Sequence, residues 1–291
     1  MAQLIVNGLS AGLTWALVAL GFSLVASVGR FFHFAHGAVF TIGAYLTFLL
    51  ASQFGLPLSL SIPLAVGLSG ILGCLMELCV YRPLRRKGAS PLILLLASLG
   101  MYIVLENVVS LAFGNEVRVI RLSQVEEGIT IAGGRLSPPQ ILVVCASVVL
   151  VTAVSLLMGK TAAGRRMRAV ASDPHLARVS GIDSDRVILW TLGLGSALAA
   201  SAGILVALDV GMVPTMGTNA LLMGVAVTIV GGIGSIPGAA MGGLLLGLVQ
   251  HLGTCKIGPQ WQDAIAFGIL LMFLLLRPCG ILGRKLRKAE I

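Results

Sequence analysis

Residues 136–159 read Leu-Ser-Pro-Pro-Gln-Ile-Leu-Val-Val-Cys-Ala-Ser-Val-Val-Leu-Val-Thr-Ala-Val-Ser-Leu-Leu-Met-Gly and contain no Asp, Glu, Lys or Arg. A helix needs ~20 mainly apolar residues to cross about 30 Å of hydrocarbon. The run also lacks the alternation of apolar and polar residues that characterises strands of outer-membrane barrels. It therefore predicts a transmembrane helix.

Charge-free runs of this kind occupy most of the chain. Only 11% of the 291 residues are charged, compared with roughly 25% in soluble domains. Mean hydropathy is +1.01. We expect an all-α, polytopic inner-membrane helical bundle, one domain over residues 1–291, with eight or nine transmembrane helices, some of them broken. The predicted spans lie near residues 4–28, 36–54, 57–80, 90–113, 138–159, 187–208, 218–230, 238–253 and 260–276.

Two of these spans, 218–230 and 238–253, are short for a full crossing at ~1.5 Å per residue. We therefore expect broken or re-entrant helices there. The first 29 residues have no basic segment before their apolar core, which favours an uncleaved first helix over a signal peptide.

The distribution of basic residues predicts the orientation. The net charge is +9, and 16 of the 20 Lys and Arg residues lie at alternate connections between the spans. The positive-inside rule places these connections in the cytoplasm, with the N-terminus outside and the C-terminus cytoplasmic. The charge thus needs no nucleic-acid partner. The four exceptions are Arg118, Arg121, Arg135 and Lys256.

A polar break follows the first span, in Gly29-Arg-Phe-Phe-His-Phe-Ala-His-Gly37. Irregular backbone at membrane depth is tolerated where it is buried in protein or lines a cavity. His33 and His36 are three residues apart and would share a helix face, so a metal pair or a proton relay is conceivable. No third ligand is near in sequence, and the five cysteines show no metal-ligand spacing, so we favour a packing or capping role and predict no metal site.

The longest basic connection, 160–186, carries strong helix signals. Asp173 before Pro174 forms an N-cap with proline at the first helical position, and Gly181 supplies a stop, which predicts a helix over 174–180. A second short helix is expected over 165–171. Such order suits docking to a cytoplasmic partner through Leu176, Val179 and Ile182. The alternative is a solvated basic loop that sets topology or touches anionic lipid.

The segment Gly231-Gly-Ile-Gly-Ser-Ile-Pro-Gly238 interrupts the apolar pattern a second time. It lacks the spacing of nucleotide-binding glycine loops, so phosphate binding is not expected. Glycines from 238 to 247 offer close helix packing. Among intramembrane acids, Glu106 is the deepest and is a functional or hydrogen-bonding candidate, whereas Glu77, with Arg82 close by, is expected at the interface.

Several motifs, in this order, are similar to those of the permease subunits of branched-chain amino-acid ABC importers, the LivH/LivM family, and more to its LivH side. One difference is His33, where that family usually shows Asn. The motifs cover nearly the whole chain: Asn7-Gly-Leu-Ser-Ala-Gly12, Phe34-Ala-His-Gly37 with Gly43-Ala-Tyr45, Gly164-Arg-Arg-Met-Arg-Ala-Val-Ala171 with Gly181-Ile182, Gly231–Gly238, and Arg277-Pro-Cys-Gly-Ile-Leu-Gly283.

The resemblance implies a transport subunit that is not an enzyme and holds no cofactor, with ATP and magnesium bound by partner chains. Implied partners are a second LivM-like permease, two ABC ATPase subunits, a periplasmic substrate-binding protein and membrane lipid. Implied substrates are branched-chain amino acids, with urea, short amides or other amino acids as alternatives. The residues that would couple to the ATPase are Arg165, Arg166, Ala169, Asp173, Ala177 and Gly181; those expected along the translocation pathway are His33, His36, Gly37, Glu106, Gly231, Gly232 and Pro237.

Three other classes of protein are less well supported by the residues. An ion-coupled secondary transporter should carry buried charge partners, which Glu106 alone does not supply. A homo-oligomeric channel would use the glycine-rich breaks as a filter, but no filter motif is present. An intramembrane enzyme would need a catalytic constellation with usable spacing, and none is visible.

Overall fold

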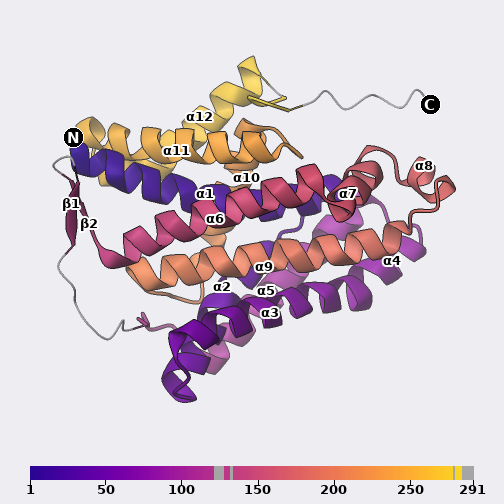
Figure 1. Ribbon diagram of the computed structural model, residues 1–291, viewed down its shortest axis with the longest axis horizontal. Coiled ribbons are helices and arrows are strands. Elements are labelled where there is room, and N and C mark those ends of the chain that lie inside the picture. The colour runs from indigo at the N-terminus through magenta and orange to yellow at the C-terminus, as the bar shows by residue number, and fades with distance from the viewer. Residues whose placement is uncertain (121–127, 132–133, 278, 284–291) are drawn as a thin grey trace.

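The computed structural model describes residues 1–120, 128–131, 134–277 and 279–283, and it is a bundle of long helices (Figure 1). The first half of the chain forms α1 (Ala2–Gly29), α2 (Ala35–Phe48) with the π-helical turn η1 (Leu49–Gln53), α3 (Leu58–Met76) with the π-helical turn η2 (Glu77–Tyr81), α4 (Arg82–Arg86) and α5 (Pro91–Phe113). The second half forms α6 (Pro138–Lys160), α7 (Ala162–Ser172), α8 (Pro174–Val179), α9 (Ser184–Val210), α10 (Met216–Gly231), α11 (Ile236–Ile257), the 3-10 turn η3 (Pro259–Trp261) and α12 (Gln262–Leu276).

Within the described residues, eight helical segments are long and apolar enough to cross a membrane. The chain is therefore a multi-pass membrane protein, as its charge-free runs predict. The ninth apolar helix, α10, has 16 residues and is shorter than a full crossing.

The expectation of a short span over 238–253 is wrong, because α11 begins earlier and ends later. The side chain of Ser235 accepts a hydrogen bond from the Gly238 N–H, and Pro237 occupies the first turn, where its missing N–H costs nothing. The helix then continues to Ile257, which gives 22 residues.

A short antiparallel hairpin departs from the all-α expectation. Strand β1 (Ile129–Ile131) pairs with β2 (Gly134–Leu136), with Ile129 opposite Leu136. Gln3 of α1 fastens it: its side-chain amide donates to the Arg135 carbonyl at 2.9 Å and its side-chain oxygen accepts from the Arg135 N–H at 2.8 Å.

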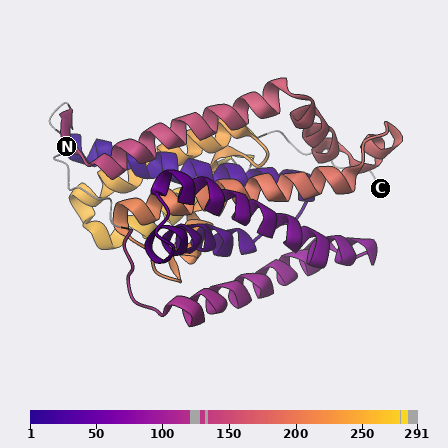
Figure 2. The same ribbon diagram turned by 60° about the horizontal axis from the view of Figure 1, so that its bottom comes forward.

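Helices α1 and α9 form the centre of the bundle, and α5 and α12 lie at its edges. In α1 and α9, 72% of the most apolar window is buried within the protein, against 22% in α5 and 6% at α12. Figure 2 shows α5 along the lower edge of the bundle. Its outward residues are large and apolar, as expected of a helix that faces lipid or another subunit.

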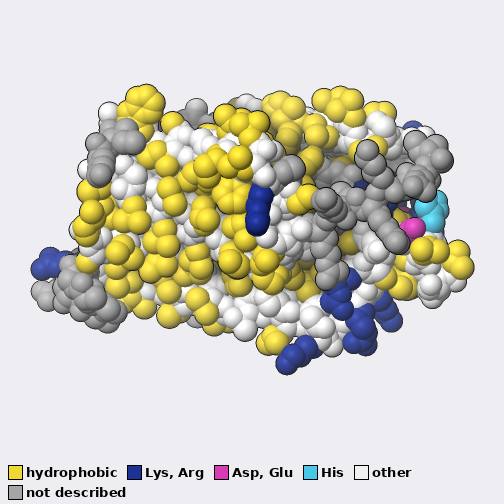
Figure 3. All heavy atoms as spheres, turned by 90° about the horizontal axis from the view of Figure 1, so that it is seen from above, with side chains coloured by type: hydrophobic (Ala, Val, Ile, Leu, Met, Phe, Trp, Pro, Cys, Tyr) yellow, Lys and Arg dark blue, Asp and Glu magenta, His cyan; other side chains and the backbone are white. Residues whose placement is uncertain are grey.

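The two ends of the bundle differ in charge. The hairpin and the N-terminus lie at one end, and α4, α7 and α8 lie at the other (Figure 1). Dark blue Lys and Arg side chains gather mainly at the α7–α8 end in Figure 3, while the flank is mostly yellow with hydrophobic side chains. We call the α7–α8 end the basic end.

Candidate functional site

Helices α7 and α8 form an ordered projection at the basic end (residues 161–186), which we call the coupling segment after the role that the sequence predicts for it. The Thr161 hydroxyl caps α7 by accepting from the Gly164 N–H at 3.1 Å. The Asp173 carboxylate caps α8 by accepting from His175 N–H at 2.8 Å and Leu176 N–H at 3.1 Å. These two backbone hydrogen bonds hold the pKa of Asp173 below its usual value. Gly181, with φ +80°, follows the C-cap of α8 and ends that helix as its sequence predicts.

The coupling segment is anchored on one side and exposed on the other. Val170 and Met167 of α7 and Ala177 of α8 are buried in the main core. On the outer side, Leu176 is 66% and Val179 is 87% exposed. Two large apolar side chains at the tip of a capped helix form a surface suited to a partner protein.

The six predicted coupling residues divide into three roles. Arg165 and Arg166 are exposed on α7. Asp173 and Gly181 shape the turns that begin and follow α8. Ala169 and Ala177 pack inward, Ala177 being buried and Ala169 half-buried.

Arg30 joins the coupling segment to the end of α1. It is the one non-glycine residue with positive φ in the described part of the chain, at 59°, and it caps the C-terminus of α1. Its guanidinium donates to the carbonyl oxygens of Ser172 at 2.8 Å and Ala171 at 3.3 Å. A strained backbone position is thus held by contacts to the end of α7.

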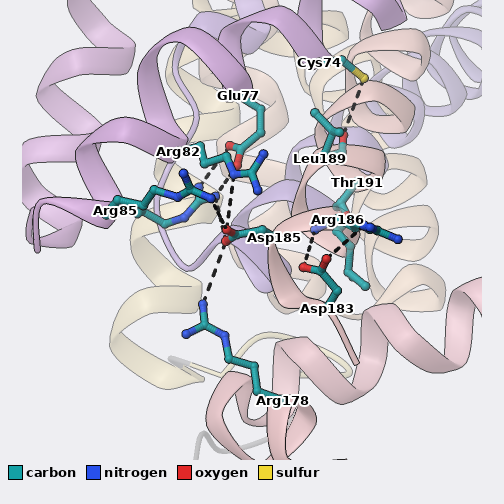
Figure 4. Close-up of polar contacts among 12 residues, drawn as sticks. Cys74, Glu77, Arg82, Arg85, Arg178, Asp183, Asp185, Arg186, Leu189 and Thr191 are labelled. Atoms are coloured by element: carbon teal, nitrogen blue, oxygen red, sulfur yellow. Dashed lines mark hydrogen bonds and ion pairs between the residues drawn. The ribbon is translucent and has the colours of Figure 1, made fainter. Parts of the chain in front are cut away.

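A cluster of charged side chains fixes α4 against the first turn of α9 (Figure 4). Its centre is Asp185, which the sequence analysis did not single out. The Asp185 carboxylate lies 3.3 Å from Arg82, 4.0 Å from Arg85, 3.8 Å from Arg86 and 3.9 Å from Arg178 of α8. Asp185 and the arginines of α4 are about a hundred residues apart in the chain, so no local sequence pattern predicts these ion pairs.

Glu77, expected at the membrane interface with Arg82 close by, lies next to α4 at the basic end, but Arg82 is not its ionic partner. Its side chain is fully buried and pairs with Arg85, whose Nη1 donates to Glu77 Oε2 at 3.0 Å. Arg82 instead contacts Asp185 (Figure 4). The π-helical turn η2 begins at Glu77 and leads directly into α4, which carries both arginines.

The two histidines of the predicted break are brought together in the core. His33 and His36 are both fully buried, with ring centroids 6.1 Å apart. His33 Nδ1 lies 3.0 Å from the Tyr81 hydroxyl, and His36 Nε2 lies 3.2 Å from the Val18 carbonyl oxygen. The second nitrogen of each ring has no hydrogen-bond partner. Among the described residues, no third His, Cys, Asp or Glu joins them in a group able to hold a metal.

The remaining pathway candidates form separate groups. Gly37 lies beside the histidines, against Gly217 at the start of α10. Gly231 and Gly232 lie at the α10–α11 turn, in contact with Gly238 and with the backbone of 279–283 respectively, and Pro237 is exposed beside them. Both groups contact α1, through Val18 and through Ser23, whose hydroxyl accepts from the Gly234 N–H.

Glu106 belongs to neither group. It is half-buried on α5, and one of its carboxylate oxygens is buried without a partner. One turn earlier on α5, Tyr102 bonds to Thr218 of α10 at 2.6 Å. This polar pair ties the peripheral α5 to the start of α10.

Residues 4–275 match the family model described as the permease component of the branched-chain amino acid transport system. The chain belongs to this family. The permease is 36% identical to the high-affinity branched-chain amino acid transport permease BraD of Pseudomonas aeruginosa, over 97% of this chain and 95% of that protein. It is 33% identical to LivH of Salmonella typhimurium, with the same coverage, and 29% identical to a probable LivH of Methanocaldococcus jannaschii, over 94% of this chain and 90% of that one.

A more distant similarity covers only part of the permease. The autoinducer 2 import permease LsrC of Yersinia enterocolitica is 31% identical over 43% of this chain. No solved structure matches the permease.

Proposed function

We propose that this chain is the permease subunit of an ABC importer that moves branched-chain amino acids across the inner membrane. The observation that carries the proposal is the coupling segment, in which two capped helices are anchored to the core and present exposed apolar residues to a partner. The family match over 4–275 and the substrates in the names of BraD and LivH support the choice of cargo.

The proposed orientation places the basic end in the cytoplasm. Basic residues concentrate beside α4, α7 and α8, and the positive-inside rule assigns such an end to the cytoplasmic face. The N-terminus and the hairpin then lie outside, where a periplasmic substrate-binding protein would deliver the amino acid. The C-terminus is cytoplasmic in this orientation.

The proposed mechanism is alternating access driven from outside the chain. Two ABC ATPase subunits, which hold ATP and magnesium, would dock on the coupling segment, and their closure would displace it. Helices α6 and α9, which lead into and out of the segment, would carry the movement into the bundle. A second LivM-like permease would complete the pathway, and lipid would cover the remaining apolar surface.

Reconstitution tests the proposal. Proteoliposomes with the permease, its permease partner and two ATPases should take up leucine only when ATP is inside and the binding protein is outside. Leucine, isoleucine and valine should compete, whereas urea and glutamate should not. Gradient-driven uptake by this chain alone would contradict the proposal and support a secondary transporter. Preferred uptake of urea or glutamate would overturn the choice of substrate.

A further inference from the structure

A line of side-chain contacts runs from the coupling segment into the core of the permease. It begins at Arg178 of α8, which lies 3.9 Å from Asp185 at the start of α9. Asp185 lies 4.0 Å from Arg85 of α4, and Arg85 pairs with the buried Glu77 (Figure 4). The charged part of the line thus crosses from α8 to the end of the α3 span.

The line continues through the π-helical turn η2 to the buried histidines. Glu77 is the first residue of η2 and Tyr81 is the last. The Tyr81 hydroxyl lies 3.0 Å from His33 Nδ1, and the His33 ring lies against that of His36, in the first turn of α2.

We propose that this polar line, formed by Arg178, Asp185, Arg85, Glu77, Tyr81 and His33, transmits displacement of α8 to the start of α2. The inference rests on the proposed function, because it assumes that partner ATPases move the coupling segment. It adds a route through the α3 span to the covalent route through α6 and α9.

The ion pairs of Asp185 depend on the position of α8. One carboxylate is shared by three arginines of α4 and one of α8. Four guanidinium groups here face two carboxylates, those of Asp185 and Glu77, so positive charge is in excess. When α8 moves, the Asp185 carboxylate redistributes among the arginines that remain, which shifts α4 relative to α9.

The ion pair between Arg85 and Glu77 passes the displacement of α4 on to η2, because the two side chains are held to each other. A fully buried carboxylate that loses its cation is strongly disfavoured, so the two side chains move together. The turn between Glu77 and Tyr81 is π-helical, and Pro83 explains it locally: proline has no N–H to bond the Cys79 carbonyl and crowds the preceding turn. A change in the winding of this turn rotates Tyr81 relative to Glu77, and π turns are frequent at functional sites.

The receiving end has unmet hydrogen-bonding capacity. Both His33 Nε2 and His36 Nδ1 are buried without a partner. Neither nitrogen is held by a protein hydrogen bond, so each ring can change its hydrogen-bond partner when its neighbour moves. A small movement of the Tyr81 hydroxyl therefore changes the position of the His33 ring, and through it that of His36 at the start of α2.

The test measures leucine transported per ATP hydrolysed by the full complex in proteoliposomes. Tyr81→Phe removes only the hydroxyl that meets His33, and Asp185→Asn removes the charge shared by the arginines. Each variant should assemble with the ATPases and lower the ratio about threefold or more. Because the two residues act in one line, the double variant should fall no further than the worse single variant.

Matched controls separate this role from general damage. Tyr45→Phe removes a buried tyrosine hydroxyl that has no partner. Asp209→Asn removes an exposed acid at the other end of α9, outside the coupling segment. Both controls should keep the wild-type ratio. Equal ratios for Tyr81→Phe and Tyr45→Phe, or multiplicative losses in the double variant, would overturn the inference.

A measurement on the wild-type complex keeps the test independent of any variant. Locking the ATPases with a non-hydrolysable ATP analogue should change hydrogen exchange at residues 33–40 together with residues 174–182. A change confined to 174–182 would overturn the polar line while leaving the proposed function intact. Absence of ATP-driven uptake by the wild-type complex would instead overturn the proposed function, and this inference with it.

Discussion

Gly12 of α1 and Gly243 of α11 lie in direct backbone contact. A Cβ atom added to Gly12 would lie 2.8 Å from the Gly243 carbonyl oxygen, and one added to Gly243 would lie 2.6 Å from the Gly12 carbonyl oxygen. One turn away on each helix, Gly8 and Gly247 repeat the approach. Since lipid is as apolar as a leucine side chain, close packing of this kind is what holds helices together in a membrane.

We therefore expect Gly12→Ala to destabilise the permease. The added methyl group cannot be placed without separating α1 from α11, and overpacking of this kind costs ~1–3 kcal/mol. The midpoint of thermal unfolding, followed by tryptophan fluorescence of the detergent-purified protein, should fall. The control is Gly100→Ala on α5, where an added Cβ meets nothing within 4 Å. Equal midpoints for the two variants would contradict this account of the α1–α11 contact.

The helices themselves were predictable because each depends on local composition. Charge-free runs set the spans, and the Asp173-Pro174 cap with Gly181 as the stop sets α8. Even the glycine contacts have a signal, since Gly8 and Gly12 share the four-residue spacing of Gly243 and Gly247. The hairpin has no clear signal in the sequence, because three-residue strands are too short to produce an alternating pattern.

The charged cluster and the histidine environment could not be read from the sequence. Asp185 meets Arg82 across 103 positions, a pairing that only tertiary packing creates. Tyr81 and His33 likewise lie 48 positions apart. Nearness in sequence favours Arg82 as the partner of Glu77, whereas the buried pair forms with Arg85, eight residues away.

Gly181→Pro should abolish ATP-driven uptake while membrane insertion stays intact. Gly181 has φ +80°, whereas proline is fixed near −65°, and its N–H donates to the Arg178 carbonyl at 3.0 Å, a bond that proline cannot make. The turn after α8 would reorient Leu176 and Val179. Leucine uptake at matched protein levels is the measurement. Gly181→Asn is the control, because asparagine tolerates the left-handed region and should keep most of the uptake. Normal uptake by the proline variant would exclude this turn from coupling.

Arg166→Glu should uncouple the ATPases without unfolding the permease. Arg166 is exposed on α7, so reversing its charge disturbs no buried contact. If Arg166 faces an acidic group of the ATPase, the new glutamate places two negative charges side by side in the interface, which costs several kcal/mol. Uptake should fall about tenfold or more, and less ATPase should co-purify with the permease. Arg166→Lys keeps the charge and should retain most of both signals. Full co-purification by the glutamate variant would place the docking surface elsewhere.

The Asp173 cap makes the order of α8 sensitive to acid. Two backbone N–H groups bind the carboxylate and lower the pKa of Asp173 in the folded protein. A lowered folded-state pKa stabilises the helix above the unfolded value of about 3.9, and this stabilisation is lost as pH falls through the folded value. Hydrogen exchange of residues 174–180, corrected for the intrinsic rate, should therefore accelerate below about pH 4.

Asp173→Asn is the matched variant for the acid sensitivity, because its amide oxygen still caps α8 but does not titrate in this range. Its exchange at residues 174–180 should be nearly independent of pH over the same window, while Asp173→Ala should exchange fast throughout. Because the Asp173 carboxylate caps only α8, the effect should be confined to α8 and leave the spans α6 and α9 unchanged. An acid-dependent acceleration of equal size in the asparagine variant would show that another group controls the start of α8.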